Sequence, residues 1–494
     1  MKNNNNLVIF TILLVIFKLL FLLTQHIQED AFITWRVAKN IVDYGVYGFN
    51  GDIKVSASTT HLYVLISVIF RLIFSDNFIY PLLIFNSILF TFGTKHIADL
   101  LLDNNKSKML FMVFINLLPP ALKISTIGME FGVLFFFYAC FLKYAMVKRQ
   151  TWAFFIFPIL IAWTRLDSAL FLIIVFVYDF VKYRKLNYAF IFAGIISIIS
   201  IVSFNYFYFG EIVNNTITAK KIAYESNETL KDRFVEMVYN TNFYSMVKIP
   251  LTIARINPFF ILSAVLSVFG FFRIKSSLAK NQFFVLCVVY TYAWVRTLVF
   301  GIVNSWFDWY YWIPQIFMFV PVILLFIGKR PTLIKTVAYA VIFCLPLMLY
   351  QTVHSIATGN GEWNYNRKVG IYIDSIEPDK NKTIYLESAG YISYFSKLKV
   401  IDFVGLVDQR VTEEFKKDRK NVDENVLKDL KPDYILEFNN PMFQGRIDSV
   451  TESHYKLIKT FHISDVARSD NYILNKIYKL KPSGRDYYLY KKIN

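Results

Sequence analysis

Cysteine and histidine are rare in this chain, and the motifs they usually build are missing. There are 3 cysteines and 6 histidines among 494 residues, and no His/Cys cluster has metal-ligand spacing. Cys140, Cys287 and Cys344 all sit inside apolar runs, where a thiol is more often a packing residue than half of a disulfide. The sequence also has no Gly-rich phosphate loop, no Ser/His/Asp set and no internal repeat.

Charged residues are scarce as well. They make up 18% of the chain, against 55% hydrophobic residues. A soluble domain could not bury so much apolar surface, so the composition predicts a polytopic α-helical membrane protein. The net charge of +17 does not indicate a nucleic-acid partner, because the basic residues cluster in short loops between apolar runs. The positive-inside rule explains such loops as cytoplasmic turns.

Five basic loops set the expected topology. Apolar runs fall in pairs between consecutive loops, and the final run, 333–352, carries the chain outward. Runs 58–74 and 79–101 break the pattern. They lie between the outer acidic stretch and the first basic loop, which is cytoplasmic, so only an odd number of crossings can connect the two. One of these runs is therefore expected to be re-entrant or interfacial. We therefore expect about eleven crossings of roughly 20 residues each. The paired runs are 109–122 with 127–146, 152–163 with 166–181, 187–209 with 250–272, and 282–302 with 310–328.

An acidic stretch follows the first apolar run. Leu7–Leu23 has membrane length and no cleavage site before Gln25, which predicts an uncleaved first span. Glu29 and Asp30 should then emerge at the far membrane face. Beyond them, apolar residues at helical spacing predict a short amphipathic helix along the membrane surface. An ordinary acid pair capping a helix beside a polar loop is the alternative interpretation.

The same topology places further polar clusters at the outer face. Glu130 lies between two apolar runs, where it is either a functional acid or a helix N-terminal residue matched to the dipole. Arg165 and Asp167 share a tight turn, where they line a pathway or neutralise each other. Lys220 and Lys221 form a third cluster, which is either a solvated surface charge or the place where a phosphate head group would lie. The last cluster is an aromatic turn with Trp309 and Tyr310, which is an interfacial belt or a substrate contact.

Composition changes after Tyr350. Residues 353–494 carry 23 Lys and Arg against 20 Asp and Glu, with no apolar run of membrane length. We expect a transmembrane domain over 1–352, with outer loops 25–57 and 210–249, and a soluble extracytoplasmic α/β domain over 353–494. In the second domain the expected helices are 365–377 and 411–430, and the expected strands are Thr383–Leu386, Val400–Val404 and Tyr434–Phe438.

The acidic stretch resembles the first extracytoplasmic loop of GT-C class membrane glycosyltransferases, with the closest likeness to the mycobacterial arabinofuranosyltransferase-like branch. That branch has an acid followed by Asp-Ala-Phe/Tyr-Ile, then Arg, Ala, Asn and Gly, then Asn-x-Gly and Thr-Ser-Pro-Leu-Trp. Two positions depart from it. Its first Asp is Glu29 here, which leaves open which acid is the base, and its Pro is His61. The matching positions are Glu29, Asp30, Ala31, Phe32, Ile33, Arg36, Ala38, Asn40, Gly45 and Asn50.

Later segments are similar to the same family. Gly128-Met129-Glu130 resembles its Gly-Leu/Met-Glu, and Thr164–Asp167 resembles its Thr-Arg-Pro-Asp with Leu in place of Pro. Tyr208–Lys220 contains its Tyr-Phe-Gly and Ala-Lys elements, whereas Lys221 has no counterpart. A second, independent similarity covers the C-terminal signature Glu387–Ser396, followed by Asp402 and Gly405–Asp408.

The resemblance implies an inverting glycosyltransferase at the outer face of the cytoplasmic membrane, which moves a sugar from a polyprenyl-phosphate donor to a cell-envelope glycan or glycolipid. Glu29 or Asp30 would take the proton of the acceptor hydroxyl. Whether Mg²⁺ or Mn²⁺ shares the phosphate charge is left open. The residues expected at the donor phosphate are Lys220 first, with Lys221, Arg165 and Arg36 in reserve. The residues expected to contact substrate are Glu130, Asp167, His61, Trp309 and Tyr310.

Two further questions stay open at this point. A lipid-linked sugar flippase, or an O-antigen polymerase or ligase, is the alternative class. A transporter would place its polar positions at mid-membrane, whereas here they collect at one face. The C-terminal domain is expected to shape the acceptor groove, with Tyr391, Tyr394 and Phe395 either stacking on sugar or forming the domain core.

Overall fold

The chain forms two compact units, each built from segments that are far apart in the sequence. In the computed structural model, the helical unit comprises Met1–Leu23, Leu83–Ile198 and Asn227–Thr352. The mixed unit comprises Thr24–Leu82, Ile199–Ser226 and Val353–Asn494. Residues 353–494, expected to be a domain of their own, therefore share a unit with the acidic stretch. The described residues are 2–51, 53–223, 229–233, 258–303, 307–328, 333–387, 389–438, 454–465, 476–477 and 484–493.

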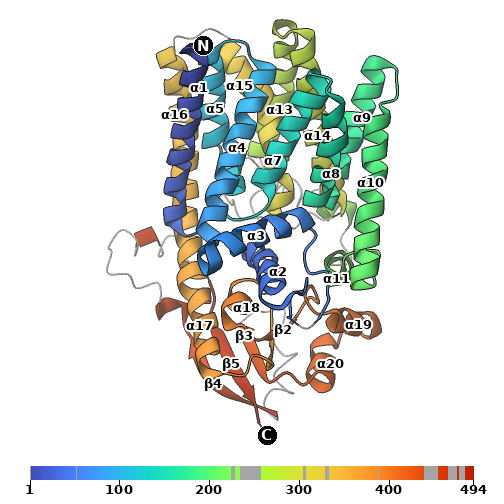
Figure 1. Cartoon of the computed structure of the whole chain (residues 1–494). Helices are drawn as coiled ribbons and strands as arrows, with labels where there is room; N and C mark the ends of the chain where they lie inside the picture. Colours follow the sequence, from blue (N-terminus) through green and yellow to red (C-terminus); the bar gives the residue numbers. More distant parts are fainter. Residues whose placement is uncertain are drawn as a thin grey trace. The chain divides into compact units, whose positions relative to one another are not determined.

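Long apolar helices run alongside one another in the helical unit (Figure 1). The helices lying wholly or mostly in this unit are α1 (Lys2–Leu19), α4 (Ile79–Leu101), α5 (Asn105–Leu117), α6 (Pro119–Thr126), α7 (Phe131–Cys140), α8 (Thr151–Thr164), α9 (Ala169–Tyr183), α10 (Tyr188–Phe204), α13 (Pro258–Ile274), α14 (Lys280–Val303), α15 (Trp312–Gly328) and α16 (Leu333–Gly359). Short 3-10 or π segments extend or join them: η1 (Leu20–Thr24), η3 (Phe141–Val147), η4 (Leu166–Ser168), η6 (Lys275–Ser277) and η7 (Asp308–Tyr311).

The number of membrane-length helices is smaller than the eleven crossings expected. Within the described part of the chain, 4 helices are long and apolar enough to cross a membrane, or up to 5 if one bent pair is a single span. Several other expected runs form helices of fewer than 18 residues, such as α8 and α9. Residues 250–257 of the run 250–272, and the side chains of 333–344 in the run 333–352, lie outside the described part of the chain. The four qualifying helices are Asn6–Thr24, Tyr188–Phe209, Lys280–Gly301 and Trp309–Gly328.

The bent pair explains one of these differences. The run 109–122, expected as one crossing, is divided between α5 and α6, which meet at an angle of 76°. Pro119 and Pro120 begin α6, and proline cannot supply the backbone N–H that would continue the preceding helix. A continuous hydrophobic pattern therefore becomes two short helices.

The core of the helical unit lies around α15. Nearly all residues of this helix are buried, and it packs against α5, α6, α13 and α14. A helix that is apolar on all sides is expected at such a central position. Cys140 and Cys287 of this unit carry free thiols, whereas the side chain of Cys344 lies outside the described part of the chain.

A five-stranded sheet with order β2-β1-β3-β5-β4 forms the centre of the mixed unit. The first three strands are parallel, and β5 and β4 add antiparallel pairs at one edge. Parallel strands need crossover connections, which are usually helical. The strands are β1 (Thr383–Leu386), β2 (Lys399–Asp402), β3 (Tyr434–Phe438), β4 (Tyr455–Phe461) and β5 (Tyr487–Lys492).

Helices from all three segments belong to the mixed unit. The acidic stretch forms α2, which ends where Gly45 adopts a left-handed conformation with φ 69° and its N–H caps the carbonyls of Asn40 and Ile41. The helical elements are α2 (Glu29–Tyr44), α3 (His61–Phe74), η2 (Ser75–Asn77), η5 (Asn205–Phe209), α11 (Asn215–Ala223), the π-helix η8 (Asn360–Asn366), α17 (Arg367–Ile376), α18 (Tyr391–Ser396), α19 (Gln409–Lys417), α20 (Val422–Asp429) and η9 (Ile463–Asp465).

The C-terminal residues form an α/β fold, as the sequence predicts. Strands β1 and β3 have the predicted bounds, whereas β2 begins one residue earlier than predicted and also ends earlier. The helix predicted over 411–430 is two helices, because the chain breaks between α19 and α20. Strands β4 and β5 are not predicted from the sequence. Of the predicted outer loop 210–249, residues 224–228 and 234–249 lie outside the described residues.

Candidate functional site

The acid pair at the start of α2 is attached to the C-terminal signature. The Oε1 atom of Glu29 accepts hydrogen bonds from the backbone N–H groups of Gly390 and Tyr391, at 2.9 and 3.0 Å. A Cβ atom on Gly390 would lie 2.4 Å from the Glu29 carbonyl oxygen, so only glycine allows this approach. The two segments that resemble the same family are therefore in direct contact.

Asp30 differs from its neighbour in its surroundings. Its carboxylate makes no hydrogen bond or ion pair among the described residues, and the residue is half-buried. It lies in the first turn of α2. Neither carboxylate oxygen of Asp30 has such a partner among the described residues, whereas Oε1 of Glu29 is held by two backbone N–H groups.

Two other polar residues that match the family pattern, Arg36 and Asn50, bond backbone groups. Arg36 donates to the carbonyl oxygens of Ser393, of Leu398 at 2.5 Å and of Phe49 at 3.0 Å. Asn50 exchanges two hydrogen bonds of 2.9 Å with the backbone of Val400 in β2. The phosphate-binding role predicted for Arg36 stays a prediction, but its contacts are those of a framework residue.

The apolar face of α2 is buried against protein. Phe32 and Trp35 are 0% exposed, and the Phe32 ring lies 4.0 Å from the Tyr391 ring and 5.3 Å from the Tyr394 ring, between centroids. Tyr391 is also fully buried, and its hydroxyl donates to the Ile27 carbonyl at 3.1 Å. Of the two interpretations of these tyrosines, the described packing is that of a core.

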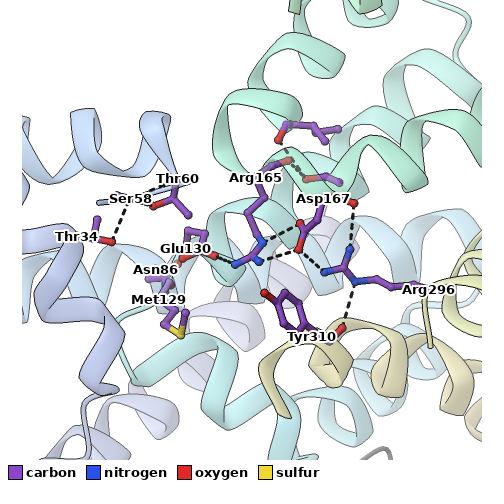
Figure 2. Close-up of polar contacts among 12 residues, drawn as sticks. Thr34, Ser58, Thr60, Asn86, Met129, Glu130, Arg165, Asp167, Arg296 and Tyr310 are labelled. Carbon is purple, nitrogen blue, oxygen red and sulfur yellow. Dashed lines mark hydrogen bonds and ion pairs between the residues drawn. The ribbon is translucent and has the colours of Figure 1, made fainter. Parts of the chain in front are cut away.

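The other predicted residues of the mixed unit, His61, Lys220 and Lys221, are not among the contacts described for Glu29 and Asp30. His61 is buried, and its ring nitrogens lie 2.9 Å from the Tyr47 hydroxyl and 3.4 Å from the Asn214 amide. Lys220 and Lys221 lie on α11, with Lys221 exposed. Near the start of α3, hydroxyls form a chain of hydrogen bonds that comprises Thr34, Ser58 and Thr60 (Figure 2).

A cavity of about 310 Å³ opens beside Glu29 in the mixed unit. Glu362 and Asn366 of η8 line it, together with Arg485. Burial raises the pKa of Glu29 to about 7, against the opposing hydrogen bond from Gly390. Burial also raises the pKa of Glu362 well above its usual range, and the nearby Glu29 carboxylate adds to this.

The predicted acids and arginine of the helical unit form one ionic network (Figure 2). Arg165 donates to both carboxylate oxygens of Asp167, at 2.9 and 2.8 Å, and also to Oε1 of Glu130. The Arg165 and Glu130 side chains are 8% and 3% exposed. A bidentate pair of this kind is among the stronger charge-assisted contacts in proteins. Arg165 is therefore already neutralised by two carboxylates.

Arg296 of α14 completes the network, and it is not among the residues predicted from the sequence. It donates to the Asp167 carboxylate at 2.9 Å and to the Tyr310 carbonyl at 3.1 Å. An arginine within an apolar run of membrane length is the signal that could have found it, because such residues are costly unless they are paired. Tyr310 and Trp309 lie on η7, and the Trp309 ring stacks on Phe307 at 4.5 Å. Residues 304–306 of this predicted aromatic turn lie outside the described residues.

Asn86 of α4 fixes the turn that presents Glu130. Its amide nitrogen donates to the Met129 carbonyl at 2.6 Å (Figure 2). Its oxygen accepts from the Val133 N–H at 3.1 Å. A Cβ atom on Gly132 would lie 2.3 Å from that oxygen. Glu130 is thus positioned by a buried amide that no sequence pattern singles out.

The structure therefore gathers seven of the predicted residues into two sets, and His61, Lys220, Lys221 and Trp309 belong to neither. Glu130, Arg165, Asp167 and Tyr310 share the network of the helical unit, whereas Glu29, Asp30 and Arg36 share α2 in the mixed unit. No group of three or more His, Cys, Asp or Glu residues with metal-binding geometry occurs among the residues described. Glu362, Asn366 and Arg485 are not predicted from the sequence, because their significance depends on a cavity formed by distant segments.

Comparison with known protein families finds a match in the C-terminal part of the chain. Residues 355–490 match a family described as "Domain of unknown function (DUF8728)". This match covers the C-terminal part of the mixed unit, including β1 to β4 and most of β5. No curated protein matches the chain.

Proposed function

We propose that this protein is a membrane glycosyltransferase that moves a sugar from a polyprenyl-phosphate donor to a cell-envelope glycan or glycolipid, by inversion, at the outer face of the cytoplasmic membrane. The observation that carries the proposal is the contact between Glu29 and the amides of Gly390 and Tyr391. Two separate segments that resemble the same family pack together, which is expected if they serve one site.

The membrane-length helices support the donor class. A polyprenyl chain is soluble only in lipid, so its phosphate-linked sugar must be met by a protein that is itself in the membrane. Four described helices meet the length and apolarity that a bilayer requires. The polar loops and residues 353–494 would lie on the side of the membrane where the acceptor is found.

The two acids take different roles in this proposal. Asp30 is the base that removes the proton from the acceptor hydroxyl as the anomeric carbon is attacked, because its carboxylate has no other partner among the described residues. Glu29 is a positioning residue, since Oε1 is held by two backbone N–H groups. A positioned base of this type typically contributes about a hundredfold to ten-thousandfold.

The donor phosphate needs a cation that it can reach. Arg36 donates to three backbone carbonyls and Arg165 is shared between two carboxylates, and both side chains are buried. Lys220 stays the first candidate and Lys221 the first reserve, because α11 leaves Lys220 half-buried and Lys221 exposed. A phosphate leaving group gains negative charge in the transition state, so a preorganised ammonium would stabilise it more than the ground state.

The proposal is tested by sugar transfer in detergent. Purified Asp30→Asn protein, given a polyprenyl-phosphate sugar and envelope acceptors, should lose at least about a hundredfold in turnover while it still binds labelled donor. Glu29→Gln keeps an acceptor oxygen for Gly390 and should lose less. Asp43→Asn, on the same helix and paired with Arg71 at 3.4 Å, is the matched control and should keep its rate.

Two outcomes would contradict the proposal. Full turnover by Asp30→Asn would remove Asp30 from the base role. Absence of any product from the wild-type chain, with intact donor binding, would favour the flippase interpretation, because a transporter moves the donor without cleaving it.

A further inference from the structure

Two residues that line the cavity beside Glu29 carry side-chain oxygen atoms that lack hydrogen-bond donors. Asn366 is 9% exposed, and its Oδ1 atom has no hydrogen-bond partner among the described residues. The Oε2 atom of Glu362 is likewise buried without a partner there. Both side chains line the cavity. Buried polar atoms in proteins are nearly always satisfied, so something from outside the chain is expected to meet these two.

The charge of the cavity indicates what that partner is. Glu29 and Glu362 both line it, and Asp30 and Glu387 lie near enough to act on the Glu29 carboxylate. Arg485 is the basic residue in the described lining, but its guanidinium is bonded to Glu387 and lies 3.7 Å from the centre of the Phe438 ring. The described lining therefore offers no free cation to its acidic groups, and the unsatisfied atoms are acceptors.

Room is available for a hydrated ligand at this position. The cavity of about 310 Å³ is several times the roughly 30 Å³ that one water molecule occupies in the liquid. Gly361 and Gly484 form part of its wall without side chains. Gly484 has φ +110°, and a Cβ atom there would lie 2.5 Å from the Ile463 side chain. An ion with several bound waters can therefore be accommodated.

We propose that this cavity is a binding site for a divalent cation held by the carboxylates of Glu29 and Glu362 and the amide oxygen of Asn366. Two carboxylates balance the charge of the ion, and waters complete its shell. Oxygen ligands of this kind select Ca²⁺ or Mg²⁺ over softer metals. The ion joins the first residue of α2 to η8, and its binding does not depend on which reaction the chain catalyses.

Metal binding by the full chain tests this inference directly. Detergent-purified protein is stripped with EDTA, freed of chelator, and titrated calorimetrically with CaCl₂ and, in parallel, with MgCl₂ and MnCl₂. We expect one cation per wild-type chain. Glu362→Gln and Asn366→Ala should each weaken binding by at least about tenfold, because each removes one of few protein ligands. Glu424→Gln, which makes the same change at a carboxylate paired with Lys428 on α20, should leave affinity unchanged.

Stability provides a second readout that does not depend on activity. Ca²⁺ should raise the thermal unfolding midpoint of the wild-type chain and of Glu424→Gln, and raise it much less in the two site variants. The inference is overturned if none of the three cations binds the wild-type chain at millimolar concentration, or if Asn366→Ala and Glu362→Gln bind as tightly as wild type. A variant that does not fold is replaced by the other, since each removes a different ligand.

Discussion

At the scale of single residues, a match to a family motif does not distinguish a chemical role from a framework role. Arg36 and Asn50 match the resemblance, yet their side chains bond backbone groups in α18 and β2. Asp402 of the C-terminal signature behaves in the same way. It is fully buried, and its carboxylate accepts hydrogen bonds of 2.8 Å from the N–H groups of Leu406 and Val407.

Asp402 gives the mixed unit a pH dependence with a definite sign. Burial raises its pKa from 3.8 to about 6, against the opposing hydrogen bond from Val407. The folded chain therefore holds a proton that the unfolded chain has released, and Asp402 contributes less stability as pH rises from about 4 to about 6. In Asp402→Asn this contribution is absent, so the stability of wild type relative to the variant should fall over that window and stay constant above it.

Thermal unfolding in detergent at pH 4.5, 5.5, 6.5 and 7.5 measures this difference. Asp429→Asn, at an exposed position of α20, is the control for loss of a carboxylate and should follow the wild-type curve. A constant difference between wild type and Asp402→Asn across all four values would show that folding does not raise the pKa of Asp402.

At the scale of elements, the ionic network ties three parts of the helical unit together. Arg296 on α14 reaches Asp167 in η4 and the carbonyl of Tyr310 in η7. Replacing it with methionine leaves Glu130 and Asp167 facing Arg165 alone, and breaking a buried pair in this way typically costs about 3 kcal/mol or more. We expect Arg296→Met to be strongly destabilising.

A double-mutant cycle measures how far the network acts as a unit. In Asp167→Asn with Arg296→Met, the loss of stability should be smaller than the sum of the single losses, by about 0.5–3 kcal/mol. Denaturant unfolding of the purified chain gives the three values. Strict additivity would show that Arg296 and Asp167 are not energetically coupled.

The elements also show what the sequence can and cannot predict. The buried strands β1 and β3 are predictable because each is a short apolar run between polar segments. Strand β4 is not, because it lies at the sheet edge and most of its residues are exposed, so Lys and Thr interrupt the pattern. The acid pair is evident from its residues, whereas Glu362 and Asn366 matter only through a cavity, which local spacing does not encode.

At the scale of the whole molecule, the mixed unit is completed by three segments of the chain. Its core combines Ile33, Val37 and Phe49 with residues of β1 to β5. Fully burying one large apolar side chain is worth about 1.5–3 kcal/mol, so the C-terminal residues lose much of their stability without the acidic stretch. We expect the fragment 353–494, expressed alone, to lack cooperative unfolding.

Adding the missing segment should restore this fold. A fusion of residues 24–82 to 353–494 through a flexible linker should gain protection of the β1 and β3 amides from hydrogen exchange. The same fusion carrying Phe32→Ser should gain less, because Phe32 packs on Tyr391. Cooperative unfolding of 353–494 by itself would show that the sheet is an independent domain, as the sequence indicates.

The hydrogen bond between Gly390 and Glu29 spans 361 residues, and this separation matters while the chain is being made. Ribosomes add about 5–20 residues each second, so α2 is synthesised roughly 20–70 s before the helix that covers it. Throughout that interval Phe32 and Trp35 lack much of the native surface on which they pack. The nascent chain is therefore more susceptible to proteolysis and aggregation than the finished protein. Stalled synthesis would leave the chain in this incompletely packed state.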